Sequence, residues 1–462
     1  MSQAKPMKKS SKDFRSFMMI LEKENELVHV KREVNTEYEI AAVTAKLDGK
    51  QAIFFENVRD SKIRITCNVL ATPRRFYLAL GGTTEKSNEH NVKKNIHTRV
   101  TEALNTLSDP VRTQDGGLFE ENSSRNLYDL PIVTHFEKDA GPFITSSIVF
   151  SENQEKGKQN QSTHRLLRLD DRHMAIRMVE SRHLHKCFTY ARDHDEDLKV
   201  AIAIGVHPAV NIAAAYQAAY GVDEMLIANS LLGGSLVLSK TSYSELYVPN
   251  HAEIILEGRI LNDTTHEEWM VEMLRTYDFK RKQPVFELEK IMFRNNAIYH
   301  DILPGYAEHR MLMGLPVEAK MYDYIKNVVP STQSVHLTDG GSNWLSAVVQ
   351  IKKRLEGEPK NALLAAFTAH PSLKIAIVVD DDINPTDPIA VEYAIATRCQ
   401  ADTDLTVIPN AKGSSLDPSS DQDNLLTTKL GIDATATILK SKERFEIAKI
   451  PGEEKVDLSD YL

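Results

Sequence analysis

Strand-like and helix-like segments both recur along this chain, and this mixture limits the fold more than any other feature. Apolar runs such as residues 51–58 and 374–383 are typical of strands. Residues 14–21 carry apolar side chains at i, i+3, i+4 and i+7, a spacing that predicts a helix. At 462 residues the chain exceeds one ordinary core. We therefore expect a multidomain protein of the α+β or α/β class.

The first part of the chain predicts a small α/β domain. Residues 1–12 form a basic stretch without apolar spacing, which we interpret as a mobile tail. Strand patterns follow at 26–34, 51–58 and 63–70, and an amphipathic helix is expected at 97–107. We place the N-terminal domain at residues 1–110.

The middle part, residues 111–303, predicts a β-barrel or sandwich with inserted helices. A polar segment at 151–162 lacks apolar spacing and is expected to be a loop. Residues 164–179 alternate basic and apolar side chains around Asp170-Asp171, as in a hairpin. His183 and His185 are expected on one face of a further strand.

The last part, residues 304–462, predicts a C-terminal α/β domain with a polar tail. Helices are expected at 308–316, 343–354 and 360–370, because their apolar residues recur at helical spacing. A buried strand at 374–383 precedes a helix that starts with Asp387 and Pro388. The apolar helical segments suggest a homodimer or a higher homo-oligomer.

The charge balance excludes some partners. The chain has 56 Lys and Arg against 65 Asp and Glu, a net charge of -9, and so lacks the basic footprint that nucleic-acid binding needs. No apolar run approaches the roughly 20 residues of a membrane span. No secretory signal is visible, and three widely spaced cysteines fit a reducing cytoplasm.

Three polar clusters are candidates for binding chemistry, because general cofactor and nucleophile motifs are missing. Asn160, Ser162 and Arg165 offer an amide, a hydroxyl and a guanidinium, although composition alone favours a solvated loop. His183 is either a ligand or an ordinary histidine. Glu224 stands where an acid often compensates a helix dipole. An Asn, a His and a Glu together suit a divalent ion such as Mn²⁺.

An acidic and aromatic segment supplies a candidate for proton transfer. Glu267 and Glu272 stand five positions apart, with Trp269 between them. Taken alone, a solvated acidic face is the better interpretation. In an acid/base site, Trp269 and Met270 would desolvate a carboxyl group and so help it to hold a proton.

These segments, in this order, resemble the UbiD family of reversible decarboxylases that use prenylated FMN. The resemblance extends from about residue 13 to about residue 432. The family pattern N-x-S-x-x-R occurs here at residues 160–165, and His183 follows Arg165 by eighteen positions. Glu224 follows a Gly-Val pair, and the signature of an Arg followed by E-x4-E matches Arg165, Glu267 and Glu272.

One departure indicates a subset of the family. Many members carry glycine and proline between the two acids, whereas this chain has neither between Glu267 and Glu272. In this respect, and over residues 272–291 and 309–316, the chain is similar to archaeal anhydromevalonate phosphate decarboxylases and to enzymes acting on furan or pyrrole carboxylates.

The resemblance implies a set of cofactor ligands. The central domain would be a split β-barrel that binds prenylated FMN, which a flavin prenyltransferase supplies. Mn²⁺, with K⁺ as a possible addition, would hold the flavin phosphate through Asn160, His183 and Glu224. The residues implied in cofactor binding are Asn160, Ser162, Arg165, Arg182, His183, Glu224 and Lys374.

The resemblance also implies catalytic roles. Arg165 and Glu267 would form a pair that orients the substrate acid, and Glu272 would protonate the carbon that loses CO₂. The implied substrate is trans-anhydromevalonate 5-phosphate, which gives isopentenyl phosphate for isoprenoid biosynthesis. Heteroaromatic or phenolic acids are the alternative. A non-catalytic flavin-binding assembly subunit is a rival of another class, but it would be expected to lack one of the three residues.

A phosphorylated substrate would need further cations. Those available near the acidic segment, or shortly after it, are Arg275, Lys280, Arg281 and Arg310. His309 is a further candidate to face the substrate.

Overall fold

The protein was analysed as a computed structural model, and its two compact units are described separately. The first unit comprises Met1–Lys320, Asp339–Trp344 and Ser415–Pro418, and the second comprises Met321–Thr338, Leu345–Ser414 and Ser419–Leu462. The predicted basic tail, residues 1–12, lies outside the described residues. The structure describes residues 13–83, 89–180, 182–216, 218–448, 450–452, 456–457 and 461.

The helices of the first unit bury the apolar faces that the sequence predicts. Helix α1 begins after Asp13, whose side chain accepts a hydrogen bond from the Ser16 backbone N–H and so caps the helix. Its buried residues include Phe14, Phe17 and Leu21, as expected from their spacing. The helices in this unit are α1 (Phe14–Lys23), α2 (Glu39–Lys46), α3 (Pro73–Ala79), α4 (Glu89–Asn105), α5 (His183–Asp193), α6 (Pro208–Ala215) and α7 (Glu224–Leu231), followed by α8 (Ala307–Val328), which continues into the second unit.

A small sheet contains the three N-terminal strands that the sequence predicts. Its order is β1 (Leu27–Val30), β2 (Ala52–Phe55), β3 (Arg64–Cys67) and β16 (Ile298–His300). Strand β16 comes from the predicted central segment yet pairs in parallel with β3. The chain therefore returns to its first sheet just before α8. The division into domains at residues 1–110, 111–303 and 304–462 stays a prediction.

The largest sheet carries most of the candidate site, and it does not close into a barrel. Among the described residues its hydrogen-bonded order starts at β6 and ends at β8, while β5 pairs with β15 to one side. The order along this path is β6 (Phe143–Ile144), β9 (Leu166–Arg168), β10 (His173–Ile176), β15 (Arg281–Phe293), β14 (Ile254–Glu268), β11 (Leu198–Ile204), β7 (Ile148–Asn153) and β8 (Lys158–Thr163), with β5 at Asn122–Ser124. A third sheet contains β13 (Tyr247–Pro249), β12 (Val237–Lys240) and β4 (Val111–Thr113).

Two local expectations were wrong, and both affect the site. Residues 158–163 form strand β8, although a loop was expected from their polarity. Asn160 and Gln161 are buried there because β8 pairs with β7, so polar side chains occupy a buried strand. His183 opens helix α5, whereas the sequence suggested a strand shared with His185. The hairpin with its turn at Asp170-Asp171 is confirmed by β9 and β10.

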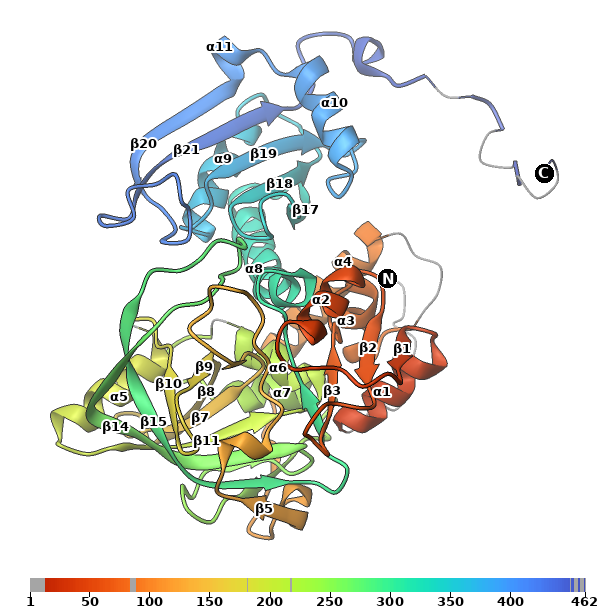
Figure 1. Cartoon of the computed structure of the whole chain (residues 1–462). Helices are drawn as coiled ribbons and strands as arrows, with labels where there is room; N and C mark the ends of the chain where they lie inside the picture. Colours follow the sequence, from red (N-terminus) through yellow and green to blue (C-terminus); the bar gives the residue numbers. More distant parts are fainter. Residues whose placement is uncertain are drawn as a thin grey trace. The chain divides into compact units, whose positions relative to one another are not determined.

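Two long antiparallel strands, β14 and β15, position the acidic segment. They run side by side in Figure 1, and their register places Glu268 opposite Arg281 and Glu267 opposite Lys282. Side chains alternate between the two faces of a strand. Consequently Glu267 is exposed and Glu268 is fully buried. Residues 269–280 form the connection between the two strands.

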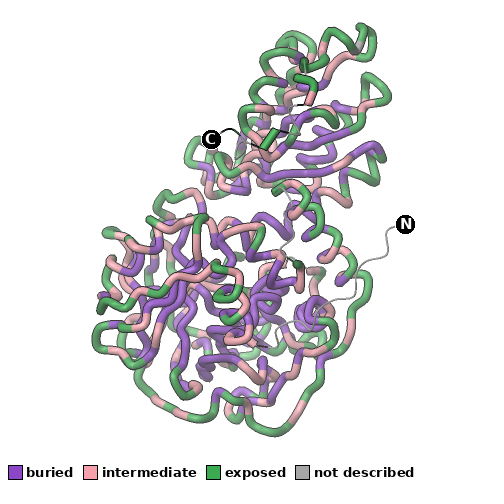
Figure 2. The backbone as a smooth tube through the Cα atoms, turned by 90° about the vertical axis from the view of Figure 1, so that its right-hand side faces the viewer, coloured by how far each residue is buried: buried purple, intermediate pink, exposed green. Residues whose placement is uncertain are grey.

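The buried residues of the first unit fall into two main cores, each of which joins N-terminal and central segments. One core packs α1 and α3 residues against β11 and α6, and the other packs the first sheet against the largest sheet. Figure 2 shows the buried parts of the tube running through the interior of the structure, with exposed loops outside them.

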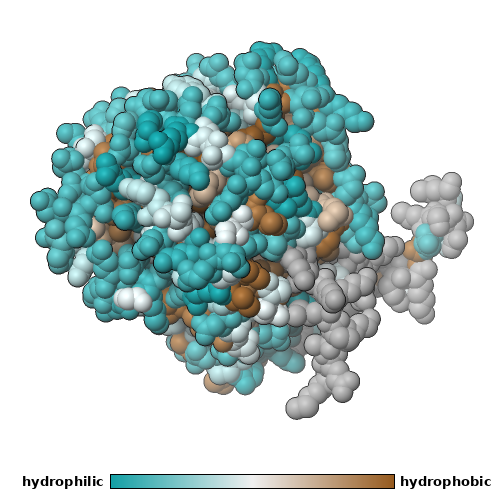
Figure 3. Space-filling view, turned by 90° about the horizontal axis from the view of Figure 1, so that it is seen from below, coloured by the Kyte–Doolittle hydropathy of each residue, from teal (hydrophilic) through white to brown (hydrophobic). Residues whose placement is uncertain are grey.

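The molecular surface is mostly polar on the face drawn in Figure 3, with scattered hydrophobic residues. Within the described part of the chain, no helix has the length and apolar character that a membrane crossing requires.

The second unit contains a five-stranded sheet flanked by helices. A helix was expected at 343–354, but residues 346–351 form β18, because this short apolar run is buried between β17 and β19. The helix after Asp387 is confirmed. The sheet order is β17 (Thr332–Leu337), β18 (Ser346–Ile351), β19 (Ile375–Asp380), β21 (Leu426–Ala434) and β20 (Leu405–Lys412), and the helices are α9 (Glu358–Ala369), α10 (Pro388–Arg398) and α11 (Ala401–Asp404).

Candidate active site

One arginine gathers three carboxylates at the end of the β14–β15 hairpin. Arg165 lies between β8 and β9, and its Nε and Nη2 donate to the two carboxylate oxygens of Glu268 at 3.0 and 2.9 Å. Its Nη2 also donates to Asp278 Oδ2 at 3.1 Å, and its Nη1 donates to Glu272 Oε1. These contacts fix the guanidinium in one plane, as bidentate pairs do.

The partner of Arg165 corrects a prediction. We expected Glu267 to pair with Arg165, but the structure places Glu268 there. The cause is strand alternation, which turns Glu267 to the exposed face beside Lys282 and leaves Glu268 with no exposed surface. Arg165 and Glu272 do come together as expected.

Charge around Arg165 is balanced by two further arginines. Arg281 donates to Asp278 Oδ1, and Arg177 Nε lies 3.9 Å from Glu268 Oε1. Burial lowers the pKa of the Arg165 guanidinium, but the charges of Glu272 and Glu268 outweigh this effect and raise it.

The pKa of Asp278 shows the same competition. Burial raises it, but the hydrogen bond from Arg281 and the charge of Arg165 outweigh burial, so the pKa of Asp278 is lowered. Asp278 is therefore ionised at neutral pH and supplies a permanent negative charge beside Arg165.

Backbone and aromatic contacts hold the connection between β14 and β15 in place. Trp269 Nε1 donates to the Lys138 carbonyl at 2.8 Å, and the Val271 N–H donates to Asp139 Oδ1 at 3.1 Å. Lys280 Nζ lies 4.2 Å from the centre of the Trp269 ring, a cation–π distance. Glu272 and Asp278 are thus carried on a braced segment.

His309 lies close to this cluster as a neutral side chain. Its Nδ1 accepts a hydrogen bond from the Gly305 N–H at 3.0 Å, so the proton of the neutral ring belongs on Nε2. Burial lowers the pKa of His309, and the charges of Glu272, Arg165 and Arg310 also act on it. His309 therefore acts electrostatically with Glu272, and its orientation toward the substrate stays a prediction.

A second cluster contains two of the three predicted metal ligands, His183 and Glu224, and the third, Asn160, is next in the chain to a residue that contacts Glu224. His183 Nδ1 lies 3.6 Å from Glu224 Oε1, and Glu224 Oε2 accepts a hydrogen bond from the Gln161 N–H at 3.0 Å. Asn160, the neighbour of Gln161 on β8, is buried, and its amide nitrogen donates weakly to Ser162 Oγ at 3.4 Å. The amide oxygen of Asn160 accepts no hydrogen bond from the residues that the structure describes.

This second cluster fits a divalent cation. Glu224 is 2 % exposed, and burial raises the pKa of its carboxyl group despite the opposing effect of His183. A bound cation would offset that burial. Nowhere in the described ranges do three His, Cys, Asp or Glu side chains gather as a metal site, and this cluster offers two of them together with an amide.

The other residues predicted to bind the cofactor form no hydrogen bond or ion pair with His183 or Glu224 within the described residues. Ser162 contacts His164 Nε2 at 2.8 Å, and burial lowers the pKa of His164 to about 4. Arg182 is exposed at the start of α5. Lys374 belongs to the second unit, where it bonds Ser419 Oγ, so its proposed role at a phosphate stays a prediction.

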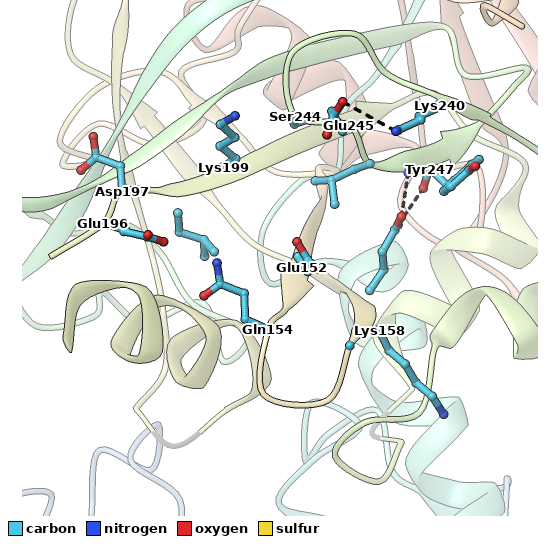
Figure 4. Close-up of a pocket in the computed structure, with 14 residues that line it drawn as sticks. Glu152, Gln154, Lys158, Glu196, Asp197, Lys199, Lys240, Ser244, Glu245 and Tyr247 are labelled. Carbon is cyan, nitrogen blue, oxygen red and sulfur yellow. Dashed lines mark hydrogen bonds and ion pairs between the residues drawn. The ribbon is translucent and has the colours of Figure 1, made fainter. Parts of the chain in front are cut away.

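A cavity of about 510 Å³ lies elsewhere in the first unit. Charged residues of both signs line it, and Lys240 pairs with Glu245 at its edge, as Figure 4 shows. None of the residues of the two clusters lines this cavity. It is therefore separate from the candidate site.

Sequence reasoning missed Glu268, Asp278 and Arg177 of the first cluster, and it named Arg281 only as a cation available to a substrate phosphate. Glu268 is the last residue of β14, so its side chain points to the face opposite that of Glu267, which is evident only once the strand is known. Asp278 and Arg281 stand three apart, a spacing that says nothing about Arg165. Arg177 gave no signal beyond its position in an alternating basic segment.

Comparison with known families identifies the chain. Residues 109–307 match the 3-octaprenyl-4-hydroxybenzoate carboxy-lyase Rift-related domain, which is the UbiD domain. Residues 18–94 and 310–434 match the N-terminal and C-terminal domains of the same carboxy-lyase. The chain therefore belongs to the UbiD family of carboxy-lyases.

Two relatives of the chain carry the name of the same decarboxylase. The chain is 49 % identical over 326 residues to the anhydromevalonate phosphate decarboxylase of Methanocaldococcus jannaschii, covering 71 % of this chain and 76 % of the relative. It is 40 % identical to the enzyme of the same name from Methanothermobacter thermautotrophicus, covering 91 % and 96 % of the two chains.

Solved structures of one enzyme show the same fold. The UbiD-class enzyme HmfF from Pelotomaculum thermopropionicum in complex with FMN is 36 % identical, with a TM-score of 0.93, covering 97 % of this chain and all of that chain. An evolved dimeric form of HmfF in complex with prFMN is 33 % identical, with a TM-score of 0.89 over 98 % and 100 % of the two chains.

Proposed function

We propose that this protein is a prenylated-FMN-dependent decarboxylase that converts trans-anhydromevalonate 5-phosphate to isopentenyl phosphate and CO₂. The observation that carries the proposal is Arg165 held by Glu268 and Asp278 while it contacts Glu272. The family membership and the two relatives named for this activity support it. HmfF, which is similar over its whole length, has been solved with FMN and with prFMN.

The chain's own residues have distinct tasks in this reaction. Arg165 donates four hydrogen bonds to carboxylates, which leaves one of its five N–H groups, on Nη1, for the substrate carboxylate beside Glu272. The bond from carbon to carboxylate breaks, CO₂ leaves, and the carbon takes a proton. We assign delivery of that proton to Glu272, the most exposed of the three acids at Arg165.

The second cluster supplies the cofactor site in this proposal. Asn160, His183 and Glu224 would hold Mn²⁺ against the flavin phosphate, with K⁺ nearby, and Ser162 and Arg182 would complete the contacts. When bound, prenylated FMN accepts the electron pair of the bond to the carboxylate. Burial of Glu224 beside His183 supports this assignment.

Further proposals follow from the same family. We place the protein in the cytoplasm, as a homodimer or a higher homo-oligomer, with a flavin prenyltransferase as the supplier of its cofactor. We also propose the three-domain division, in which the largest sheet is the split-barrel flavin domain and α8 leads into the C-terminal domain.

A substrate comparison tests the activity. The protein would be co-expressed with a flavin prenyltransferase, and CO₂ release would be measured with anhydromevalonate phosphate and with furan, pyrrole and phenolic acids. We expect flavin-loaded, Mn²⁺-containing protein that acts on the phosphorylated acid. Activity on a heteroaromatic or phenolic acid alone would mean that such an acid, and not the phosphorylated acid, is the substrate. Failure to take up any flavin would overturn the cofactor assignment.

The assembly-subunit alternative makes the opposite prediction. A non-catalytic flavin-binding subunit would take up flavin and release no CO₂ from any of these acids. Such a subunit would not need the contacts described around Arg165 for catalysis.

A further inference from the structure

A turn joins Arg275 directly to the proposed proton donor. The Glu272 N–H donates to the Thr276 carbonyl at 2.8 Å, and the Arg275 N–H donates to the Glu272 carbonyl at 2.8 Å. Arg275 adopts a φ of +61°, a left-handed conformation that is uncommon for residues other than glycine and asparagine. Such backbone outliers gather at functional sites. The position of Arg275 relative to Glu272 is thus fixed by the backbone.

The loop before α8 packs against this turn. Gly305 has a φ of +76°, and a Cβ atom there would lie 2.5 Å from Arg275 Cγ and 2.9 Å from the Glu272 carbonyl oxygen. Only glycine therefore permits this approach. The next residue, Tyr306, has its ring centre 5.3 Å from the Arg275 guanidinium carbon. This stacking orients the guanidinium without using its N–H groups.

A second arginine of the same region also keeps its hydrogen-bonding capacity. Arg310 lies in the first turn of α8, and its Nη2 is 3.8 Å from Asp48, beyond hydrogen-bond distance. Its Nε is buried without a partner. Among the residues that the structure describes, neither the Arg310 nor the Arg275 guanidinium donates a hydrogen bond.

Asp48 links the two arginines. Its carboxylate accepts a hydrogen bond from the Ala307 N–H at the start of α8, at 2.8 Å. Burial raises the pKa of Asp48, while the charges of Arg310 and Arg275 both act to lower it. One acid, already engaged with a helix N–H, thus faces two arginines. Glu308 also acts on Asp48 as a second negative charge, so the two arginines are not in excess, but their ten guanidinium N–H groups donate no hydrogen bond within the described residues.

We propose that Arg275 and Arg310 bind the phosphate group of the substrate while its carboxylate lies at Arg165 and Glu272. The proposal rests on the proposed function and adds the residues that select a phosphorylated acid. A guanidinium presents paired N–H donors that match two phosphate oxygens. The start of the long helix α8 adds a favourable dipole for the same anion.

The rest of the site gives the phosphate no equal alternative. Arg281 is engaged with Asp278, and Arg177 donates to the Met178 carbonyl. Lys280, which like Arg275 is exposed, lies over Trp269, and its single ammonium lacks the paired donors of a guanidinium. Arg275 is attached to the turn that carries Glu272, so phosphate binding there would also order the proton donor.

The test compares Arg275→Gln with Lys280→Gln in flavin-loaded protein. Both variants remove one positive charge from the connection between β14 and β15. Because arginine and glutamine are both non-glycine residues, Arg275→Gln does not add backbone freedom at position 275. Isothermal titration with ethyl phosphate is the readout that is independent of turnover. We expect Arg275→Gln to weaken binding by about ten- to a hundredfold, the range of a lost charge-assisted hydrogen bond. Lys280→Gln should change it by less than about threefold.

Kinetics with the phosphorylated acid provide the second readout. Arg275→Gln should raise KM by about ten- to a hundredfold, with a smaller fall in kcat, because ground-state binding is lost. Arg275→Lys should recover part of the affinity. Equal effects of Arg275→Gln and Lys280→Gln, or no effect of either on ethyl phosphate binding, would overturn the proposal.

Flavin content separates the two possible phosphates. If these arginines bound the phosphate of the cofactor, Arg275→Gln would lose flavin on purification, and this outcome would overturn the assignment to substrate. The proposed function fails in a different way, since wild-type protein would then bind ethyl phosphate but not decarboxylate anhydromevalonate phosphate.

Discussion

Two kinds of arginine occur in the candidate site. Arg165 donates hydrogen bonds to three carboxylates, whereas Arg275 and Arg310 donate none within the described residues. Buried charges need partners, and Arg165 has them in a fixed geometry. Arginines without such partners remain available to a ligand. The difference separates a group that orients the reaction from groups that select its substrate.

Net charge does not separate the two regions. The first cluster contains three arginines, one of which is Arg165, and three acids. The net charge of that region is therefore close to zero. In the other region Arg275 and Arg310 act on Asp48 together with Glu308, so that region is also close to neutral. The two regions differ in their hydrogen-bond donors: the guanidinium groups of Arg275 and Arg310 can bind a phosphate in our proposal, and the substrate carboxylate is left for Nη1 of Arg165.

The largest effect is expected at the proton donor. Glu272→Gln should lower the rate of CO₂ release by about 10² to 10⁴-fold, because glutamine cannot deliver a proton. The flavin and Mn²⁺ contents should match those of wild type, since Glu272 does not belong to the second cluster. Single-turnover CO₂ release, with absorbance and metal analysis, makes the measurement. A turnover rate equal to that of wild type in this variant would show that Glu272 does not deliver the proton.

The next effect distinguishes two adjacent acids. Glu268→Gln should lower the free energy of unfolding by about 3 kcal/mol, because Arg165 loses its buried bidentate partner. It should also lower kcat/KM by about a hundredfold, because a misplaced guanidinium no longer orients the acid.

The matched control is Glu267→Gln. Glu267 is exposed, so its replacement should change stability by less than about 0.5 kcal/mol and leave turnover intact. Denaturant unfolding and steady-state kinetics of both variants test the choice between them. Equal effects at the two positions would restore Glu267 as a partner of Arg165.

A smaller effect is expected at Asp278. Asp278→Asn removes one charge from Arg165 but leaves the bidentate contact with Glu268 and the Asp278 backbone in place. We expect kcat to fall by about tenfold or less, the value of one charged hydrogen bond near the lower end of its range. Steady-state CO₂ release measures the change, and a loss as large as that of Glu272→Gln would give Asp278 a direct part in proton transfer.

The sequence predicted the identity of the chemistry better than its placement. Arg165, Glu272, His183 and Glu224 were found by their spacing and their resemblance to a family. The partner of Arg165 was missed by one position, because E-x4-E spacing takes no account of the strand face. The buried face of Glu268 follows from its pairing opposite Arg281 of β15, which depends on the tertiary structure.

Other misses have a similar physical origin. Residues 158–163 were too polar to predict as a strand, but a strand beside a polar site carries such side chains. The segment 343–354 was predicted as a helix, and tertiary pairing with β17 and β19 decided for a strand. The open hydrogen bonds of Arg275 and Arg310 had no sequence signal, because they depend on what lies near each side chain after folding.

The smallest effect concerns His309, which is electrostatically coupled to both regions. Burial places the pKa of His309 in the folded protein below its unfolded value of about 6.5. The unfolded state therefore binds more protons below that pH, and stability contributed by neutral His309 is lost as pH falls. The slope for one proton is at most about 1.4 kcal/mol per pH unit. His309→Gln should reduce the loss of stability between pH 6.5 and lower pH, measured by denaturant unfolding. An unchanged pH dependence would mean that His309 has the same pKa in the folded and unfolded states, so that burial does not keep it neutral.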